Sequence, residues 1–95
     1  MFRISKAFEN DSVEILRIEG KITEENLAEW NRQISLLNTN EGRQIILDFA
    51  QVWFISFKAV EVLIHFLNDH IFILNCGMEV RNVLHASGLS ARMLE

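Results

Sequence analysis

Hydrophobic and polar residues alternate along some segments of the 95-residue chain and follow helical spacing in others. The richest apolar region, residues 45–67, begins with an apolar run that ends at Asp48. After an expected short turn, it continues into a second apolar patch at 52–55 and then an apolar helix. This order of strand, turn and helix brings the helix N-terminus, residues 56–58, to the surface at the end of a buried strand. We therefore look for function at this N-terminus.

The first half of the chain predicts a hairpin followed by a helix. Alternating residues at 2–8 and 13–20 indicate two half-buried strands, and residues 10–12 between them have turn chemistry. Thr23 is the expected N-cap of the first helix, which residues 38–42 are expected to end. Its apolar face, at helical spacing, comprises Leu27, Trp30, Ile34 and Leu37.

The second half of the chain predicts two strands and two helices. Residues 44–48 form the third predicted strand, which we expect to be covered on both faces because residues 45–47 are all apolar. The second helix is predicted over residues 57–68. The remaining predicted elements are a strand at 71–74, a helix at 78–87 closed by Gly88 and Leu89 as a Schellman motif, and a partial turn at 90–95.

Together these elements predict one α/β domain over residues 1–95. The order β-β-α-β-α-β-α implies a four-stranded mixed sheet, because a hairpin joins the first two strands and helices join the later ones. We expect the helices to pack mainly on one face of this sheet. No Pro-rich or Ser-rich linker, repeat or low-complexity segment interrupts the chain.

Composition and charge narrow the class of protein. The formal net charge is -4 and the nine Lys and Arg residues form no run, so we expect no nucleic-acid partner. The single Cys76 rules out an internal disulfide and an all-cysteine metal site within one chain. No segment resembles a signal peptide or approaches the roughly 18 apolar residues of a membrane span. We expect a cytoplasmic protein without direct membrane insertion.

Catalysis is considered for Glu61, His65 and Asp69, which follow one another at intervals of four residues in and just beyond the second predicted helix. A carboxylate beside a histidine suits acid–base chemistry. The same spacing is typical of an ordinary solvated helix face, and we favour this second interpretation. The three histidines and the cysteine lack metal-ligand spacing, and the four glycines form no phosphate-binding loop. We expect no catalytic residue, no metal and no cofactor.

The second predicted helix is apolar beyond a single face. Its expected core face comprises Val60, Leu63, Ile64 and Leu67, with Phe57 at the edge. A second apolar stripe, formed by Ala59, Val62 and Phe66, lies away from that face. Either the last helix covers this stripe, or the stripe binds a protein partner, and we favour partner binding. Trp53 either packs in the core or extends this surface. The rim of the surface would be formed by Lys58, Glu61 and His65.

Six short features occur in the order and spacing of a known family. They are residues 18–22 (Ile-Glu-Gly-Lys-Ile), Asn26, residues 45–49 (Ile-Ile-Leu-Asp-Phe), residues 52–55 (Val-Trp-Phe-Ile), residues 79–84 (Glu-Val-Arg-Asn-Val-Leu) and residues 87–89 (Ser-Gly-Leu). Over nearly all of its length the chain resembles a STAS domain, the fold of bacterial anti-sigma factor antagonists. The resemblance implies a STAS scaffold that meets partners through the start of its second helix and the neighbouring loops.

The resembled family carries the motif Asp-Ser-Ser/Thr-Gly-Leu after the position of Ile55, and a partner kinase phosphorylates its second hydroxyl residue. In this chain the motif positions hold Ser56, Phe57, Lys58, Ala59 and Val60. Lys58 occupies the phosphoacceptor position, and a lysine cannot carry a serine-type phosphate ester. The phosphosite is therefore degenerate, and we expect no phosphorylation switch there. Ser56 is interpreted as an N-cap rather than as a displaced phosphosite.

The favoured hypothesis is a non-enzymatic protein-binding module with a regulatory or scaffold role in bacterial signalling. Its partner would be an anti-sigma factor or serine kinase-like regulator of transcription. One alternative is a small cytoplasmic STAS subunit that binds the ATPase of an ATP-binding-cassette lipid transporter. Another is a homodimeric scaffold joined through Val62 and Phe66. The predicted partner-binding residues are Ser56, Phe57, Lys58, Ala59, Val62 and Phe66.

Overall fold

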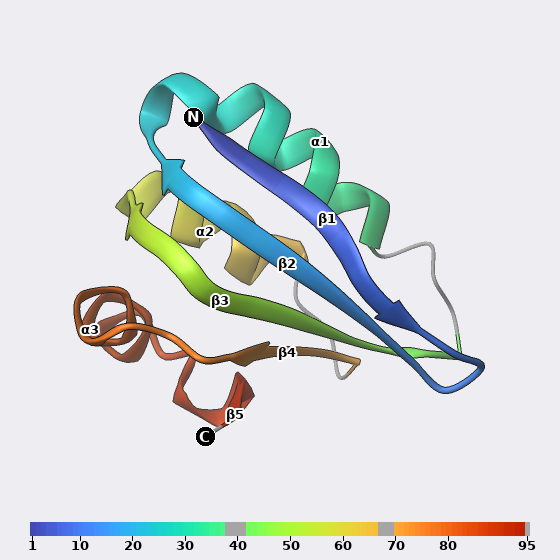
Figure 1. The fold of residues 1–95 in the computed structure, drawn as a ribbon. Helices are drawn as coiled ribbons and strands as arrows, with labels where there is room; N and C mark the ends of the chain where they lie inside the picture. Colours follow the sequence, from blue (N-terminus) through green and yellow to red (C-terminus); the bar gives the residue numbers. More distant parts are fainter. Residues whose placement is uncertain (38–41, 67–69, 95) are drawn as a thin grey trace.

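The computed structural model describes residues 1–37, 42–66 and 70–94 of the chain (Figure 1). In these residues, five strands form one sheet in the order β1-β2-β3-β4-β5. The strands are β1 (Phe2–Glu9), β2 (Val13–Ile22), β3 (Gln44–Ile55), β4 (Ile71–Leu74) and β5 (Met93–Leu94). The helices are the α-helices α1 (Leu27–Leu37), α2 (Phe57–Phe66) and α3 (Met78–Ala86), and the short 3-10 helices η1 (Glu24–Asn26) and η2 (Ser90–Arg92).

The predicted α/β fold with a mixed sheet is confirmed. Strands β1 and β2 pair antiparallel, and β2, β3, β4 and β5 are parallel neighbours. The predicted number of four strands is wrong, because Met93 pairs with Ile73 and Leu94 with Leu74 to add a fifth. Two residues are too few to show an alternating pattern, so this strand leaves no signal in the sequence.

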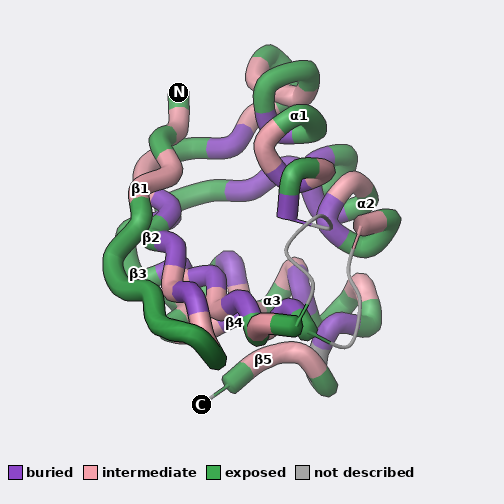
Figure 2. The backbone as a smooth tube through the Cα atoms, turned by 90° about the vertical axis from the view of Figure 1, so that its right-hand side faces the viewer, coloured by how far each residue is buried: buried purple, intermediate pink, exposed green. Residues whose placement is uncertain are grey.

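The three α-helices lie on one side of the sheet (Figure 2). On that side alternate strand residues are buried, and they include Leu16, Ile18, Leu47, Phe49, Ile71 and Ile73. Trp30 of α1 is fully buried, and its Nε1 donates a hydrogen bond to the carbonyl oxygen of Ala59 in α2 at 2.9 Å. This bond joins the two helices inside the core. The predicted apolar face of α1 is confirmed, since Trp30, Ile34 and Leu37 are buried and Leu27 packs against them.

The opposite side of the sheet, which we call the open face, carries no α-helix of the described residues, and Figure 1 views the molecule from this side. Residues 44–48 were predicted to be covered on both faces. That prediction is wrong, because Ile46 and Asp48 lie half-buried on the open face. The apolar run at 45–47 therefore does not indicate two covering layers here.

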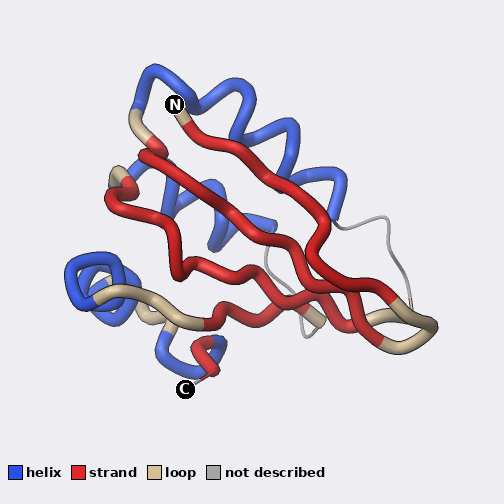
Figure 3. Tube along the Cα trace, in the orientation of Figure 1, coloured by secondary structure: helices blue, strands red, loops and turns tan. Residues whose placement is uncertain are grey.

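Strand β3 is longer than predicted, and the turn expected after Asp48 is absent from its continuous course (Figure 3). Arg17 pairs with Asp48 and Glu19 with Gln51, so two steps along β2 match three along β3. A β-bulge absorbs the extra residue. The Ala50 backbone N–H donates to Asp48 Oδ1 at 3.0 Å, a turn-like contact formed within the strand. The turn prediction mistook this bulge for a chain reversal.

Local polar contacts begin two elements where the sequence predicts them. Asn10 Oδ1 accepts hydrogen bonds from two backbone N–H groups that follow it, both at 2.8 Å, and this confirms the hairpin turn. The Thr23 backbone N–H and hydroxyl donate to Asn26 Oδ1 at 3.3 and 3.0 Å. These contacts begin η1, which leads directly into α1. The first helix therefore starts after Thr23, but with a 3-10 turn.

The predicted Schellman motif at the end of α3 is confirmed. The Leu89 N–H donates to the Leu84 carbonyl oxygen at 3.0 Å, and Gly88 has a φ of 86°. Leu89 is buried as the motif requires. The predicted end of the first helix falls mostly outside the described residues, and so does the predicted end of the second at 67–68.

Four charged side chains meet beside the hairpin turn. Lys6 Nζ lies 2.8 Å from Glu9 Oε1 and 3.4 Å from Glu14 Oε2, and Arg43 Nη1 also pairs with Glu9. Hydrogen bonds from Lys6 and Arg43 lower the pKa of Glu9 to about 2. Because Arg43 directly precedes β3, this cluster fastens the hairpin to the start of that strand.

Protonation of Glu9 should weaken this cluster. The pKa of Glu9 is lower in the folded protein than its ordinary value of 4.5, so its stabilising effect is present above that value and is lost as the pH falls towards 2. We expect Glu9→Gln to remove this part of the pH dependence. Urea unfolding of both proteins between about pH 6 and about pH 3 measures it. Parallel stability profiles would contradict the prediction.

Gly20→Ala should strongly destabilise the protein. Gly20 has a φ of 101°, and an added Cβ would collide with the carbonyl oxygen of Met1. We expect a loss of about 2–4 kcal/mol in the free energy of unfolding, from backbone strain and collision together. Gly88→Ala is the matched control, because its φ of 86° is also positive but its Cβ would meet open space. Chemical denaturation should give a loss of about 1 kcal/mol for the control, and equal losses would refute the close approach.

Candidate functional site

Three exposed aromatic residues, Trp53, Phe54 and Phe57, lie at the end of β3 and the start of α2. We call them the aromatic cluster. Their exposed fractions are 69%, 48% and 66%. Contiguous exposed apolar groups on a small protein commonly mark an interaction site, and aromatic side chains contribute much of the binding energy when a partner buries them. The aromatic cluster is therefore the candidate binding site.

A second β-bulge in β3 explains why two neighbouring aromatic residues are both exposed. Val52 pairs with Gly20 and Phe54 with Lys21, so Trp53 is the extra residue of the bulge. In a regular strand Trp53 and Phe54 would point to opposite faces, and one would enter the core. The bulge breaks this alternation, while the residues on either side of the aromatic pair stay buried.

Ser56 anchors the start of α2. It is buried, and its backbone N–H donates to the Ile22 carbonyl oxygen at 2.9 Å. The Ala59 backbone N–H donates to Ser56 Oγ at 3.2 Å, and the Val60 N–H donates to the Ser56 carbonyl oxygen at 3.0 Å. The interpretation of Ser56 as an N-cap is confirmed. Ser56 is therefore not part of the exposed surface, unlike its neighbours Phe57 and Lys58.

The apolar stripe predicted on α2 is not an exposed surface. Ala59 is fully buried, and Val62 and Phe66 are half-buried and pack against the core. Trp30 of α1 covers Ala59. The alternative interpretation from the sequence, in which the last helix covers the stripe, does not hold at this residue. The physical reason is that α2 packs beside α1 on the same face of the sheet, so the sheet and α1 together bury it over a wider arc than one helix face.

The exposed face of α2 comprises Phe57, Lys58, Glu61, Ile64 and His65. Ile64 was predicted to enter the core with Val60 and Leu63. Val60 and Leu63 are buried as predicted, but Ile64 is 42% exposed, and Leu67 lies outside the described residues. The predicted rim residues Lys58, Glu61 and His65 are all exposed. Together with the aromatic cluster they form an apolar surface with charged side chains at its border.

Two hollows border the aromatic cluster at Trp53. A groove of about 140 Å³ lies between the end of β3 and α3, and is lined by Trp53, Phe54, Ile55, Glu79, Val80 and Val83. Beside it Met78 is 78% exposed, so the apolar surface continues onto α3. The sequence did not predict Phe54 and Met78 as surface residues. Their exposure in the folded structure identifies them.

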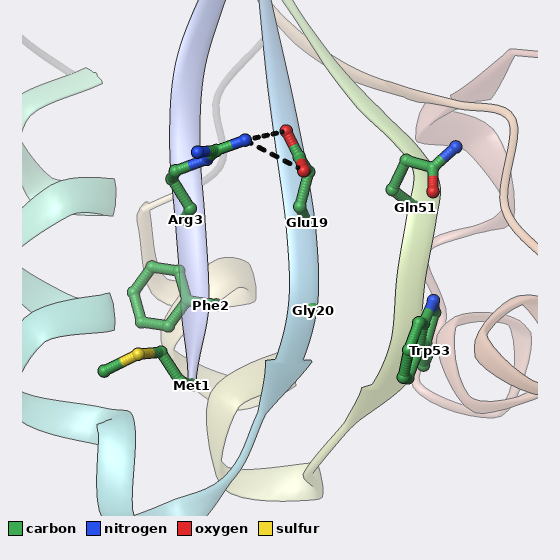
Figure 4. A pocket seen from close by; sticks show the side chains of 7 residues that line it. All are labelled: Met1, Phe2, Arg3, Glu19, Gly20, Gln51 and Trp53. Carbon is green, nitrogen blue, oxygen red and sulfur yellow. Dashed lines mark hydrogen bonds and ion pairs between the residues drawn. The ribbon is translucent and has the colours of Figure 1, made fainter.

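The second hollow is a wider trough of about 500 Å³ on the open face (Figure 4). Trp53 and Gln51 of β3 stand on one side of it, and Gly20, without a side chain, lies between them and β1. On the other side Arg3 Nη2 pairs with Glu19 Oε1 at 3.0 Å and Oε2 at 3.1 Å. The trough is polar at this ion pair and aromatic at Trp53.

The described residues bring together no three His, Cys, Asp or Glu side chains that could hold a metal ion. Within the same residues, no hydrogen bond or ion pair joins Glu61 to His65, and Asp69 lies outside them. The His65 ring instead packs edge-on against Phe66, with ring centroids 4.8 Å apart. No described helix is long and apolar enough to span a membrane.

Comparison with known proteins identifies the scaffold. The family model described as STAS domain matches residues 6–94. No curated protein sequence matches the chain.

Solved structures of anti-sigma factor antagonists share the fold. SpoIIAA in its unphosphorylated form is 19% identical, with a TM-score of 0.72 over 97% of this chain and 86% of that one. An anti-sigma factor antagonist from Mycobacterium paratuberculosis is 15% identical, with a TM-score of 0.80 over 98% and 83%. The phosphorylated form of Bacillus SpoIIAA is 18% identical, with a TM-score of 0.62 over 97% and 89%. At these identities the likeness concerns the fold.

Removal of the Ser56 hydroxyl should destabilise the start of α2. Ser56→Ala leaves the Ala59 N–H without its acceptor in a buried setting, so we expect a loss of about 1 kcal/mol in the free energy of unfolding. Ser35→Ala, which removes an exposed hydroxyl from α1, is the control and should change it by less than about 0.5 kcal/mol. Denaturant unfolding measures both, and an unchanged Ser56→Ala midpoint would contradict the capping role.

Proposed function

The chain belongs to the STAS domain family, and we propose that it is a non-enzymatic protein-binding module that acts through the aromatic cluster and the exposed face of α2. The exposure of Trp53, Phe54 and Phe57 carries this proposal. A partner that covers these three rings would remove a large apolar area from water, and aromatic residues are frequent anchors of protein interfaces. Lys58 and Glu61 at the border would orient the partner through their opposite charges.

We propose that this binding is not switched by phosphorylation at the usual family position. Lys58 stands there, and it is exposed and positively charged. The nearest hydroxyl, that of Ser56, already accepts a backbone hydrogen bond and is buried. A kinase would have to open the first turn of α2 to reach it. Control of binding would therefore come from partner concentration or from the partner's own state.

The proposed partner is an anti-sigma factor or serine kinase-like regulator. In support, structural relatives of the chain are described as anti-sigma factor antagonists, although their low identity speaks for the fold alone. Under this proposal the protein acts in the bacterial cytoplasm, and its binding to the regulator affects transcription. The ATPase of an ATP-binding-cassette lipid transporter is the competing partner, and the experiment below separates the two.

Phe57→Asp should remove partner binding without unfolding the protein. Phe57 is 66% exposed at the first position of α2, so its replacement creates no cavity. Tagged wild-type and variant chains, shown to be folded by circular dichroism, are used to capture partners from the native host's lysate. We expect an anti-sigma factor or kinase-like regulator with the wild type, and binding to the purified partner at least about tenfold weaker for the variant.

The matched control is Phe8→Asp, which also replaces an exposed phenylalanine by a charge but lies on β1, away from α2. It should capture the same partner as the wild type. Capture of a transporter ATPase that Phe57→Asp loses would replace the regulator proposal by the transporter one. Identical partners and affinities for the wild type and Phe57→Asp would refute the aromatic cluster as the site.

A further inference from the structure

A row of four apolar residues crosses the open face of the sheet. Phe8 of β1 pairs with Ile15 of β2, Ile15 with Ile46 of β3, and Ile46 with Phe72 of β4. Directly paired residues place their side chains on the same face, so the four side chains lie in line across four strands. We call them the apolar row. Phe8 is 49% exposed and the other three are half-buried.

An open sheet face is normally polar, because alternate residues face water. The apolar row departs from this rule at four neighbouring strands, and within the described residues no α-helix lies on this face (Figure 2). It does not border the groove beside α3 or the exposed face of α2. The fold therefore leaves the row without a function in the monomer.

In the next row along the strands, the charged residues Arg17 and Asp48 stand between Ser5 of β1 and Leu74 of β4. Arg17 of β2 pairs with Asp48 of β3, yet no ion pair joins their side chains in the described residues. Asp48 Oδ1 instead accepts hydrogen bonds from the Ala50 N–H at 3.0 Å and Asn75 Nδ2 at 3.4 Å. The Arg17 side chain is exposed. The positive charge of Arg17 and the negative charge of Asp48 thus lie at paired positions on the adjacent strands β2 and β3.

We propose that the open face joins two copies of this chain, sheet against sheet, about a two-fold axis that runs parallel to the strands between β2 and β3. Rotation about this axis places β2 of one copy opposite β3 of the other, and β1 opposite β4. It does not change the position of a residue along the strand direction. It places Ile15 opposite the partner subunit's Ile46, and Phe8 opposite the partner subunit's Phe72. It also places Arg17 opposite the partner subunit's Asp48, and each of these contacts occurs twice.

Self-complementarity is the reason for choosing a second copy as the occupant. The apolar row meets its own equivalent, and the exposed Arg17 meets the half-buried Asp48 of the partner subunit, so one surface satisfies both sides of a symmetric interface. Aligned packing of two twisted sheets keeps their mean strand directions within about 30° of each other, and this arrangement falls in that class. The Arg92 guanidinium lies over the Phe72 ring, 5.9 Å from its centroid, and so partly covers this end of the row with a polar group.

The size of the contact indicates a weak dimer. Four strands about 4.8 Å apart and two rows of side chains give a flat contact of roughly 300 Å² per subunit. This is below the area of a standard interface, so we expect a dissociation constant between about 10 μM and 1 mM. The inference does not rest on the proposed function, because Phe57 and Lys58 do not belong to the open face.

Sedimentation velocity from about 5 μM to about 1 mM tests the dimer. The wild type should pass from monomer to dimer in this range, and Phe8→Asp should weaken the association at least about tenfold, because it places a carboxylate in the apolar contact. Phe57→Asp should dimerise like the wild type. A wild type that stays monomeric at the highest concentration, or an undiminished Phe8→Asp dimer, would overturn the proposal.

A charge exchange tests the two-fold arrangement itself. Arg17→Asp alone places two carboxylates opposite each other at both contacts and should dissociate, as should Asp48→Arg with two guanidinium groups. An equal mixture of the two variants should form a heterodimer, because each contact again joins opposite charges. If Asp48→Arg does not fold, Arg17→Asp and Phe8→Asp still decide the proposal. A folded mixture that stays monomeric would refute this axis.

Discussion

The direction of the chain through the sheet constrains the rest of this structure. Strands β2, β3, β4 and β5 are parallel and follow one another in sequence, so each of the three crossovers steps in the same direction. Crossovers between parallel strands are right-handed in nearly all proteins, and three such steps in one direction must bring their helices to the same face. The other face is left open as a direct consequence.

This arrangement accounts for both the buried and the exposed sides of α2. The helix packs on the sheet beside α1, and there the Trp30 indole reaches the Ala59 carbonyl oxygen. A small residue at position 59 lets the two helices approach, and a larger one would separate them. What remains exposed is the arc that includes Phe57, Lys58 and Ile64. The candidate site is thus what is left of an apolar helix after two neighbours have packed on it.

Local signals in the sequence predict much of the fold, because they act over a few residues. The Asn10 turn, the Ser56 N-cap and the Gly88–Leu89 helix end each depend on contacts within four or five residues. Strand β5 and the bulges of β3 were not predicted, because both depend on pairing with distant strands. The bulge near Asp48 even has the polar contact of a turn, which explains why a turn was expected there.

The sequence predicted a candidate site at the start of α2, but it predicted the exposed residues there only in part. Seven of the ten residues of α2 are apolar, so the helical spacing alone does not fix which arc faces the core. Ala59, Val62 and Phe66 were assigned to the surface, whereas α1 and the core take up that arc. Phe54 escaped notice because alternation along a regular strand would expose only one member of the Trp53–Phe54 pair.

Trp53 is the member of the aromatic cluster that also lines a hollow on the open face. It lines the groove beside α3 and also the trough on the open face, in which Arg3 and Glu19 form the opposite wall. A substitution at Trp53 would therefore alter both hollows at once, although neither hollow includes a residue of the apolar row. Phe57 and Phe8 are better probes of the two proposed surfaces. Phe57 is the first residue of α2, and Phe8 lies on β1 beside the hairpin turn. Because the apolar row lies toward the start of β3 and the aromatic cluster at its end, a partner seated on the cluster leaves the row accessible to a second copy.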